Sequence, residues 1–115
     1  MKNYLVFSMA ALLVGASCNT KQEKAAEGFT GAPGEVKLVT LDPGHFHAAL
    51  VQKVSYPQVS KDVYVYAPTG FDVDEHLKRI QGFNTRAENP TAWNEIVYTG
   101  DDYLAKNVDR EERET

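Results

Sequence analysis

Residues 41–50, LDPGHFHAAL, decide how this chain is organised. The residues that lead into them, 36–41 (VKLVTL), are nearly all apolar or β-branched, which is typical of a strand covered on both faces. Apolar residues recur at helical spacing after Gly44, until residues 56–57 (Tyr-Pro) end the pattern. These residues are Phe46, Ala49, Leu50 and Val54. The stretch is therefore predicted to be the turn from a first strand into a first helix.

Two more strands are predicted downstream. Residues 62–67 (DVYVYA) alternate Val and Tyr, which is the period of a strand, and residues 95–98 (EIVY) form a short third strand. The tyrosines of these strands are expected to be packing residues.

Two more helices are predicted after these strands. Asp72 with Glu75 three residues later is typical of an N-cap pair, and Gly82 is expected to end the helix. The face of this helix that is expected to be buried contains Val73, Leu77 and Ile80. A last helix is expected to start after residues 100–102 (Gly-Asp-Asp), with Leu104 on its inner face.

Strands that alternate with helices at these spacings predict an α/β fold with a parallel sheet. The prediction is a partial Rossmann-like domain of about three βα units over residues 36–107, followed by a charged tail, 108–115. Such a sheet has an open edge and an incompletely covered face. We therefore expect the chain to be truncated, the front portion of a longer protein.

The N-terminus has the features of an export signal. Residues 1–17 combine a positive start, a short apolar run and small residues at the end, and Cys18 follows directly. The segment resembles a bacterial lipoprotein signal, so Cys18 is expected to be lipidated and to anchor the protein in the cell envelope. Residues 18–35, rich in Lys, Glu, Ala and Gly, are expected to form a flexible linker.

The charge of the chain argues against nucleic acid as a partner. Removal of Lys2 with the signal leaves 11 basic and 16 acidic residues, a formal net charge of −5. Binding to phosphates needs clustered Lys and Arg, and the basic residues here are scattered among acidic ones.

Three strings of the sequence resemble a known family. DPGHFHAAL (42–50), VYVYAP (63–68) and GFNTRAENPTAWNE (82–95), followed by VYTGDDYL, are similar to the N-terminal nucleotide-binding domain of the Gfo/Idh/MocA oxidoreductases. The likeness covers about residues 36–105 and is strongest to a secreted branch from Bacteroidetes-like bacteria. It implies a Rossmann-like fold, NAD or NADP as cofactor and sugar-type substrates. The family's Lys-Pro motif and substrate domain would follow this portion, so no catalytic residue is expected here.

The family's phosphate-binding turn, G-x-G-x-x-G, has changed in this chain. Only the second glycine remains, as Gly44, and Asp42 replaces the glycine of the tight turn, where its charge would repel a phosphate. The ribose-binding acid at the end of the second strand is missing, because the nearest acids, Asp72 and Asp74, belong to the next helix. The resemblance implies these cofactor-binding positions: Asp42, Pro43, Gly44, His45, Phe46, His47, Pro68 and Thr69.

The turn at residues 42–47 allows other functional interpretations. Asp42, His45 and His47 could bind a divalent metal, as in a fragment of a metal-dependent hydrolase. The histidines could equally be structural, with His45 a donor at the helix start and His47 packed or hydrogen-bonded.

Trp93 could stack on a sugar or anchor a loop. A non-enzymatic envelope lipoprotein that binds a glycan or a protein is therefore an alternative function. The residues predict no oligomeric state.

Overall fold

The computed structural model describes residues 28–114, which form one small α/β unit. The predicted signal peptide, Cys18 and the first part of the linker lie outside the described residues. The elements follow in the order β1 (Val36–Leu41), 3₁₀-helix η1 (Phe46–Gln52), β2 (Val59–Ala67), α1 (Phe71–Thr85), β3 (Asn94–Thr99) and α2 (Tyr103–Glu114).

The three strands form a parallel sheet in the order β1-β2-β3. At its carboxyl end Leu41 is in register with Tyr66, and Tyr66 with Tyr98. The prediction of an α/β fold with a parallel sheet is therefore confirmed, and each predicted strand lies within an observed one. β2 begins at Val59, three residues before the predicted start, because its first residues continue the pairing with Val36.

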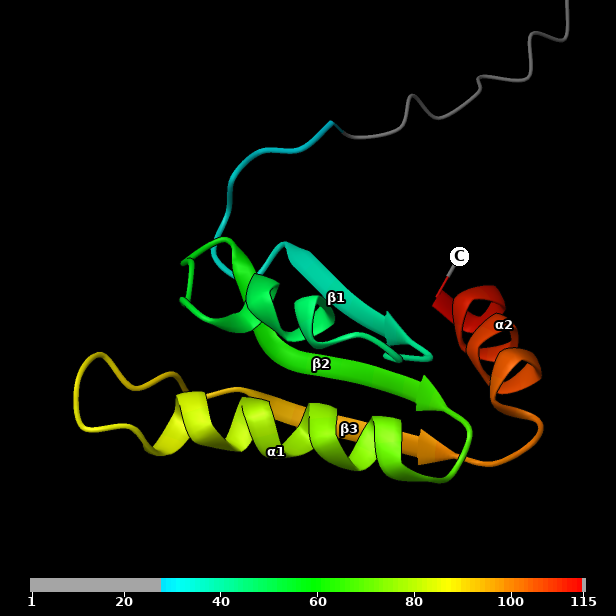
Figure 1. The fold of residues 1–115 in the computed structure, drawn as a ribbon. Helices are drawn as coiled ribbons and strands as arrows, with labels where there is room; N and C mark the ends of the chain where they lie inside the picture. Colours follow the sequence, from blue (N-terminus) through cyan, green and yellow to red (C-terminus); the bar gives the residue numbers. More distant parts are fainter. Residues whose placement is uncertain (1–27, 115) are drawn as a thin grey trace, which may run out of the picture.

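Helices lie on both faces of the sheet, and β2 is the buried centre (Figure 1). Val63 packs with Ala49 of η1, Ile80 of α1 and Trp93, and a neighbouring cluster continues this face towards the carboxyl end. The second cluster contains Val65, Ala67 and Val73. The tyrosines of DVYVYA point to the opposite face, where the Arg110 guanidinium of α2 lies 4.8 Å from the centre of the Tyr64 ring.

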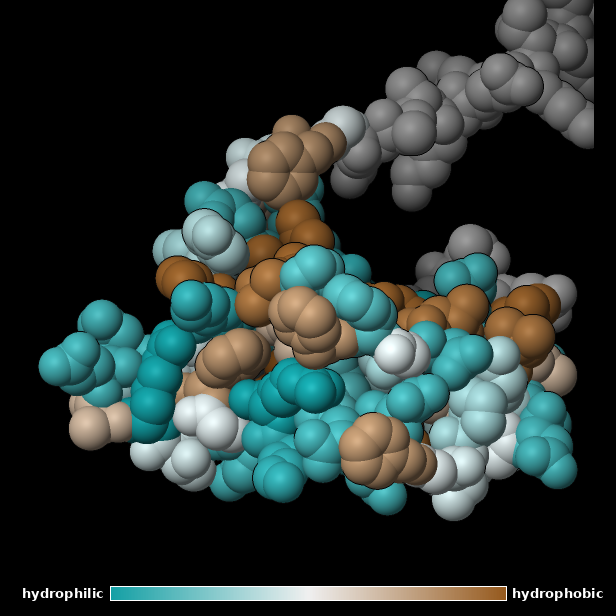
Figure 2. Space-filling model, in the orientation of Figure 1, coloured by the Kyte–Doolittle hydropathy of each residue, from teal (hydrophilic) through white to brown (hydrophobic). Residues whose placement is uncertain are grey.

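β1 differs from the prediction that both of its faces are covered. Its residues alternate between half-buried and exposed, and Val39 and Leu41 are exposed. The reason is its position at the edge of the sheet, because α2 packs on β2 and β3. Figure 2 shows further hydrophobic side chains at the surface of the molecule. The exposed large hydrophobic residues of the described chain include Phe46, Leu50, Leu104 and Val108.

The first helix is shorter and tighter than predicted. It is a 3₁₀-helix that ends at Gln52, and Phe46, Leu50 and Val54 are about half exposed. A 3₁₀-helix has three residues per turn, so residues three apart lie on one face. Ala49 and Gln52 are accordingly its buried residues.

Helix α1 corrects two predictions about helix ends. Its N-cap is Gly70, without a side-chain cap, and Asp72 lies in the first turn, where its charge favours the helix dipole. Gly82 does not end the helix, which continues to Thr85. A glycine inside a helix costs about 1 kcal/mol, which the burial of Val73, Leu77 and Ile80 on one face outweighs. The prediction of this buried face is confirmed.

Helix α2 runs through most of the predicted tail and ends at Glu114, so the boundary at residue 108 falls inside a helix. Leu104, predicted on the inner face, is 53% exposed, and Arg110 is buried instead. The face of the sheet below α2 carries tyrosine rings, which attract cations, and Lys106 and Arg110 lie over Tyr98 and Tyr64.

No helix among residues 28–114 is long and apolar enough to cross a membrane.

Candidate functional site

The two turns at the carboxyl ends of β1 and β2 form the candidate site. The Asp42 amide donates to the Tyr66 carbonyl over 2.8 Å, which extends the β1–β2 pairing into the first turn. Asp42 then adopts a left-handed backbone with φ of 46°, and the Gly44 amide donates back to the Asp42 carbonyl. Asp is one of the few side chains that tolerates this conformation, so Asp42 serves in place of the expected glycine.

The histidines of the turn are exposed and interact with one another. The His47 amide donates to His45 Nδ1 over 3.3 Å, and the two rings lie 4.5 Å apart between centroids. His45 is therefore an acceptor at the helix start, which corrects the predicted donor role. Within residues 28–114, no three His, Cys, Asp or Glu side chains are close enough to hold a metal ion, so the metal interpretation gains no support.

Two hollows open between these turns and the start of α1. The first, of about 210 Å³, is lined by Pro43, Gly44, His45, Phe46, Phe71, Asp72, Glu75 and Arg79. The second, of about 200 Å³, is lined by Asp42, Pro68, Thr69, Gly70, Phe71 and Asp72. The structure thus brings together all of the predicted cofactor-binding positions except His47, which does not line either hollow. Such grouping is expected, because the carboxyl ends of parallel strands meet at one edge.

The walls of the hollows carry more negative than positive charge. Asp42, Asp72 and Glu75 contribute carboxylates, and Arg79 contributes a guanidinium that lies 3.9 Å from Glu75. Two exposed aromatic rings, Phe46 and Phe71, stand beside them. The arrangement favours a ligand with a flat apolar group and neutral hydroxyls.

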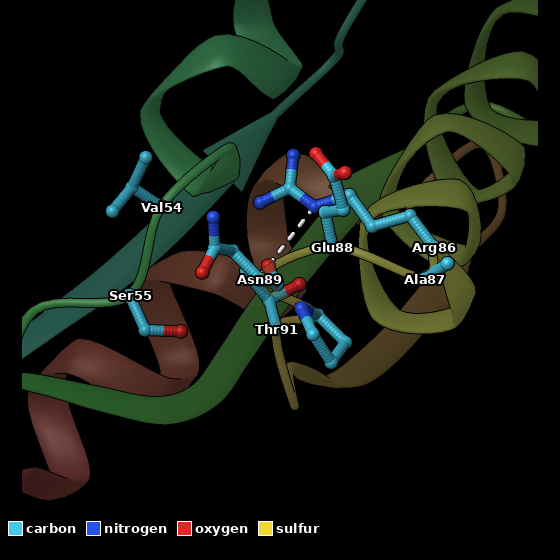
Figure 3. Close-up of a pocket in the computed structure, with 8 residues that line it drawn as sticks. Val54, Ser55, Arg86, Ala87, Glu88, Asn89 and Thr91 are labelled. Atoms are coloured by element: carbon cyan, nitrogen blue, oxygen red, sulfur yellow. Dashed lines mark hydrogen bonds between the residues drawn. The ribbon is translucent and has the colours of Figure 1, made fainter.

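A larger hollow lies at the opposite edge of the sheet, where the strands begin, and is bounded by part of the GFNTRAENPTAWNE string. Its volume is about 890 Å³, and Arg86, Glu88 and Asn89 stand on its wall (Figure 3). Arg86 is not free to bind a ligand with its whole guanidinium, because Nε donates to the Asn89 carbonyl and Nη2 to the Lys53 carbonyl. We interpret GFNTRAENPTAW as a structural motif that ties the two amino-edge loops together.

Asn84 and Trp93 complete this structural motif. Asn84 Oδ1 accepts from the Thr91 hydroxyl and the Trp93 amide, and Asn84 Nδ2 donates to the Trp93 carbonyl. The Trp93 indole is buried and donates to the Gln52 carbonyl over 2.6 Å. Trp93 therefore anchors a loop on the core, one of the two roles predicted for it, and is not exposed for stacking on a sugar.

Sequence reasoning missed the burial of two polar residues, Gln52 and His76, and the half-buried position of Glu95. Gln52 is fully buried and its side-chain amide donates to Glu95, while one oxygen of each side chain has no partner among the described residues. Burial raises the pKa of Glu95, and the hydrogen bond from Gln52 partly opposes this shift. His76 of α1 is also buried, and burial together with the charge of Arg79 lowers its pKa. No local pattern identifies these residues, because their burial depends on which elements pack against them.

Glu95→Gln is expected to raise the free energy of unfolding by about 1 kcal/mol at pH 8. The folded state favours protonated Glu95. The stability that this preference adds is fully present below the ordinary carboxyl pKa and is lost as pH rises through the raised pKa of Glu95. A glutamine amide is neutral at every pH and can donate to the unpartnered Gln52 oxygen. Urea unfolding of both chains at pH 5 and pH 8 measures the difference. A variant less stable than the wild type at pH 8 would contradict the expectation.

Comparisons with known proteins support the interpretation of this chain as an oxidoreductase-like fragment. No family model matches the chain, and no curated protein matches it. A crystal structure of "a putative oxidoreductase" from Parabacteroides merdae is 91% identical, covers 75% of this chain and superposes with a TM-score of 0.73. This chain spans 20% of the length of that chain. The fold described above is thus a partial Rossmann-like α/β fold, and its relative carries it within a much longer protein.

Proposed function

We propose that this chain is the front portion of a longer oxidoreductase of the Gfo/Idh/MocA type, and that its carboxyl-edge hollows hold NAD or NADP. The observation that carries the proposal is the convergence of the two βα turns on one pair of hollows. The 91% identity to a protein described as "a putative oxidoreductase" supports the reaction class. Sugar-type substrates and the catalytic residues belong, in this proposal, to the remainder of the longer protein.

The residues present fit the cofactor in part. Gly44 is exposed on the first hollow, and only the Asp72 carboxylate comes within 4 Å of the position a Cβ would take there. The aromatic rings of Phe46 and Phe71 offer apolar surfaces for a base. The carboxylate of Asp42 opposes a phosphate, so the pyrophosphate depends on Gly44 and the amides of the turn. The bound nicotinamide would supply hydride transfer, and this chain's residues would bind and orient the cofactor.

The proposal includes export and anchoring. The apolar N-terminal run, the small residues after it and Cys18 support a signal peptide and a lipid-anchored protein of the cell envelope.

Calorimetry with the complete longer protein tests the cofactor proposal. Titration with NAD⁺ and NADP⁺ is expected to show saturable binding of one cofactor per chain. A matched titration with a neutral oligosaccharide tests the alternative function of a glycan-binding lipoprotein. Binding of the oligosaccharide without binding of either dinucleotide would overturn the cofactor proposal and favour that alternative.

A further inference from the structure

Gln52 and Glu95 meet between the end of η1 and the start of β3. Gln52 Nε2 donates to Glu95 Oε1, while Gln52 Oε1 and Glu95 Oε2 are both buried and have no hydrogen-bond partner among the described residues. Both unpartnered atoms are oxygens, so neither can donate to the other while Glu95 is ionised. One proton between them would satisfy both, and buried polar atoms are nearly always satisfied in folded proteins.

We propose that Glu95 is protonated in the folded chain and forms a cyclic acid–amide pair with Gln52, and that this pair is a pH-sensitive lock between η1 and β3. In the pair, the Glu95 hydroxyl donates from Oε2 to Gln52 Oε1, beside the bond that Gln52 Nε2 donates to Glu95 Oε1. The proton is taken from solvent water and returns to it as pH rises. The inference does not depend on the identity of any ligand.

The side chains around Glu95 favour the neutral acid. Its partner in the β2–β3 register is Val63, which is fully buried. Glu95 also lines a hollow of about 360 Å³ whose other lining residues, from α1 and β3 and including Gln81 and Asn84, are all uncharged. A carboxylate in such surroundings would lose hydration without gaining a cation.

The charged residues nearest to the pair along the chain are Lys53 after η1, Lys61 of β2 and Arg86 after α1. Lys53 and Lys61 are exposed, and Arg86 is engaged with the Asn89 and Lys53 carbonyls. Burial raises the pKa of Glu95, and these cations are not among the causes that act on it. The environment of the pair therefore provides no charge that would hold Glu95 ionised.

The pair connects the core to the first carboxyl-edge hollow. Gln52 is the last residue of η1, a seven-residue helix that begins at Phe46, directly after the turn that lines this hollow. The Gln52 carbonyl accepts from the Trp93 indole, so both the backbone and the side chain of this residue are held by the segment that leads into β3. Loss of the proton leaves a carboxylate against an amide oxygen and loosens the end of η1.

Infrared spectroscopy of the complete protein tests the protonated state directly. The difference between the wild type and Glu95→Gln at pH 5.5 is expected to contain the carbonyl band of a protonated carboxylic acid, and at pH 8 that of a carboxylate. Glu88→Gln is the matched control, because Glu88 is exposed and its difference spectrum is expected to show a carboxylate at both pH values. A carboxylate band for Glu95 at pH 5.5 would overturn the inference.

Hydrogen exchange followed by mass spectrometry tests the lock. In the wild type, protection of residues 46–52, corrected for the intrinsic exchange rate, is expected to be at least about threefold lower at pH 8 than at pH 5.5. Glu95→Gln keeps a neutral pair at both pH values, so its protection is expected to stay constant, while Glu88→Gln follows the wild type. Constant protection in the wild type, or an equal loss in Glu95→Gln, contradicts the lock. The wild-type comparison needs no variant, so it decides the question even where Glu95→Gln is unfolded.

Discussion

Replacement of Trp93 by Ala is expected to lower the free energy of unfolding by about 3 to 5 kcal/mol. The indole is 6% exposed and packs with Ala49, Val63 and Ile80, so its removal leaves a cavity in the main core cluster. It also leaves the Gln52 carbonyl without its indole donor. A domain of this size has little stability to lose, and we expect the variant to be largely unfolded at room temperature.

Urea unfolding followed by far-ultraviolet circular dichroism measures this effect. Dichroism is needed because Trp93 is the single tryptophan of the chain, so its fluorescence disappears with it. Phe71→Ala is a matched aromatic control, since its ring is 76% exposed and its loss is expected to change stability by less than about 0.5 kcal/mol. A Trp93→Ala chain within about 1 kcal/mol of the wild type would show that the indole is not a core anchor.

Gly44→Val is expected to weaken dinucleotide binding by the complete protein at least a hundredfold. Gly44 lines the first hollow, and a valine there adds branched bulk where the proposed pyrophosphate must approach the backbone. Calorimetry with NAD⁺ measures the loss, and circular dichroism of the variant verifies that the sheet is intact.

Gly44→Ala is the graded control for this change. Its Cβ would lie 3.6 Å from Asp72 Oδ2, an ordinary contact, so the alanine chain is expected to fold normally and to lose less affinity than the valine chain. Equal affinity of the valine chain and the wild type would contradict a pyrophosphate position at Gly44.

The sequence predicted the sheet because strand patterns depend mainly on local alternation. In DVYVYA, Val63 and Val65 are buried on one face while Tyr64 meets α2 on the other. The site positions were predictable for a related reason, because parallel strands bring the turns that follow them to the same edge. Asp42, Gly44 and Thr69 accordingly line neighbouring hollows.

Other features depend on packing that no local pattern records. Leu104 has the spacing of an inner residue, but the tyrosine face below α2 favours Arg110 and leaves the leucine exposed. Gly82 has the composition of a helix end and lies inside a helix, because tertiary burial outweighs its low propensity. The Asp72 carboxylate lies beside Gly44, a residue 28 positions earlier, and only the tertiary structure shows that they are neighbours.

The strand order β1-β2-β3 has a consequence for how the chain acquires its structure. Each strand pairs with the strand that precedes it, so every partner is already present when the next segment leaves the ribosome or a translocation channel. Pairing between successive strands keeps loop-closure costs lower than pairing between distant strands would, and it favours vectorial folding from the N-terminus. This portion can therefore serve as a template on which later segments of a longer chain assemble.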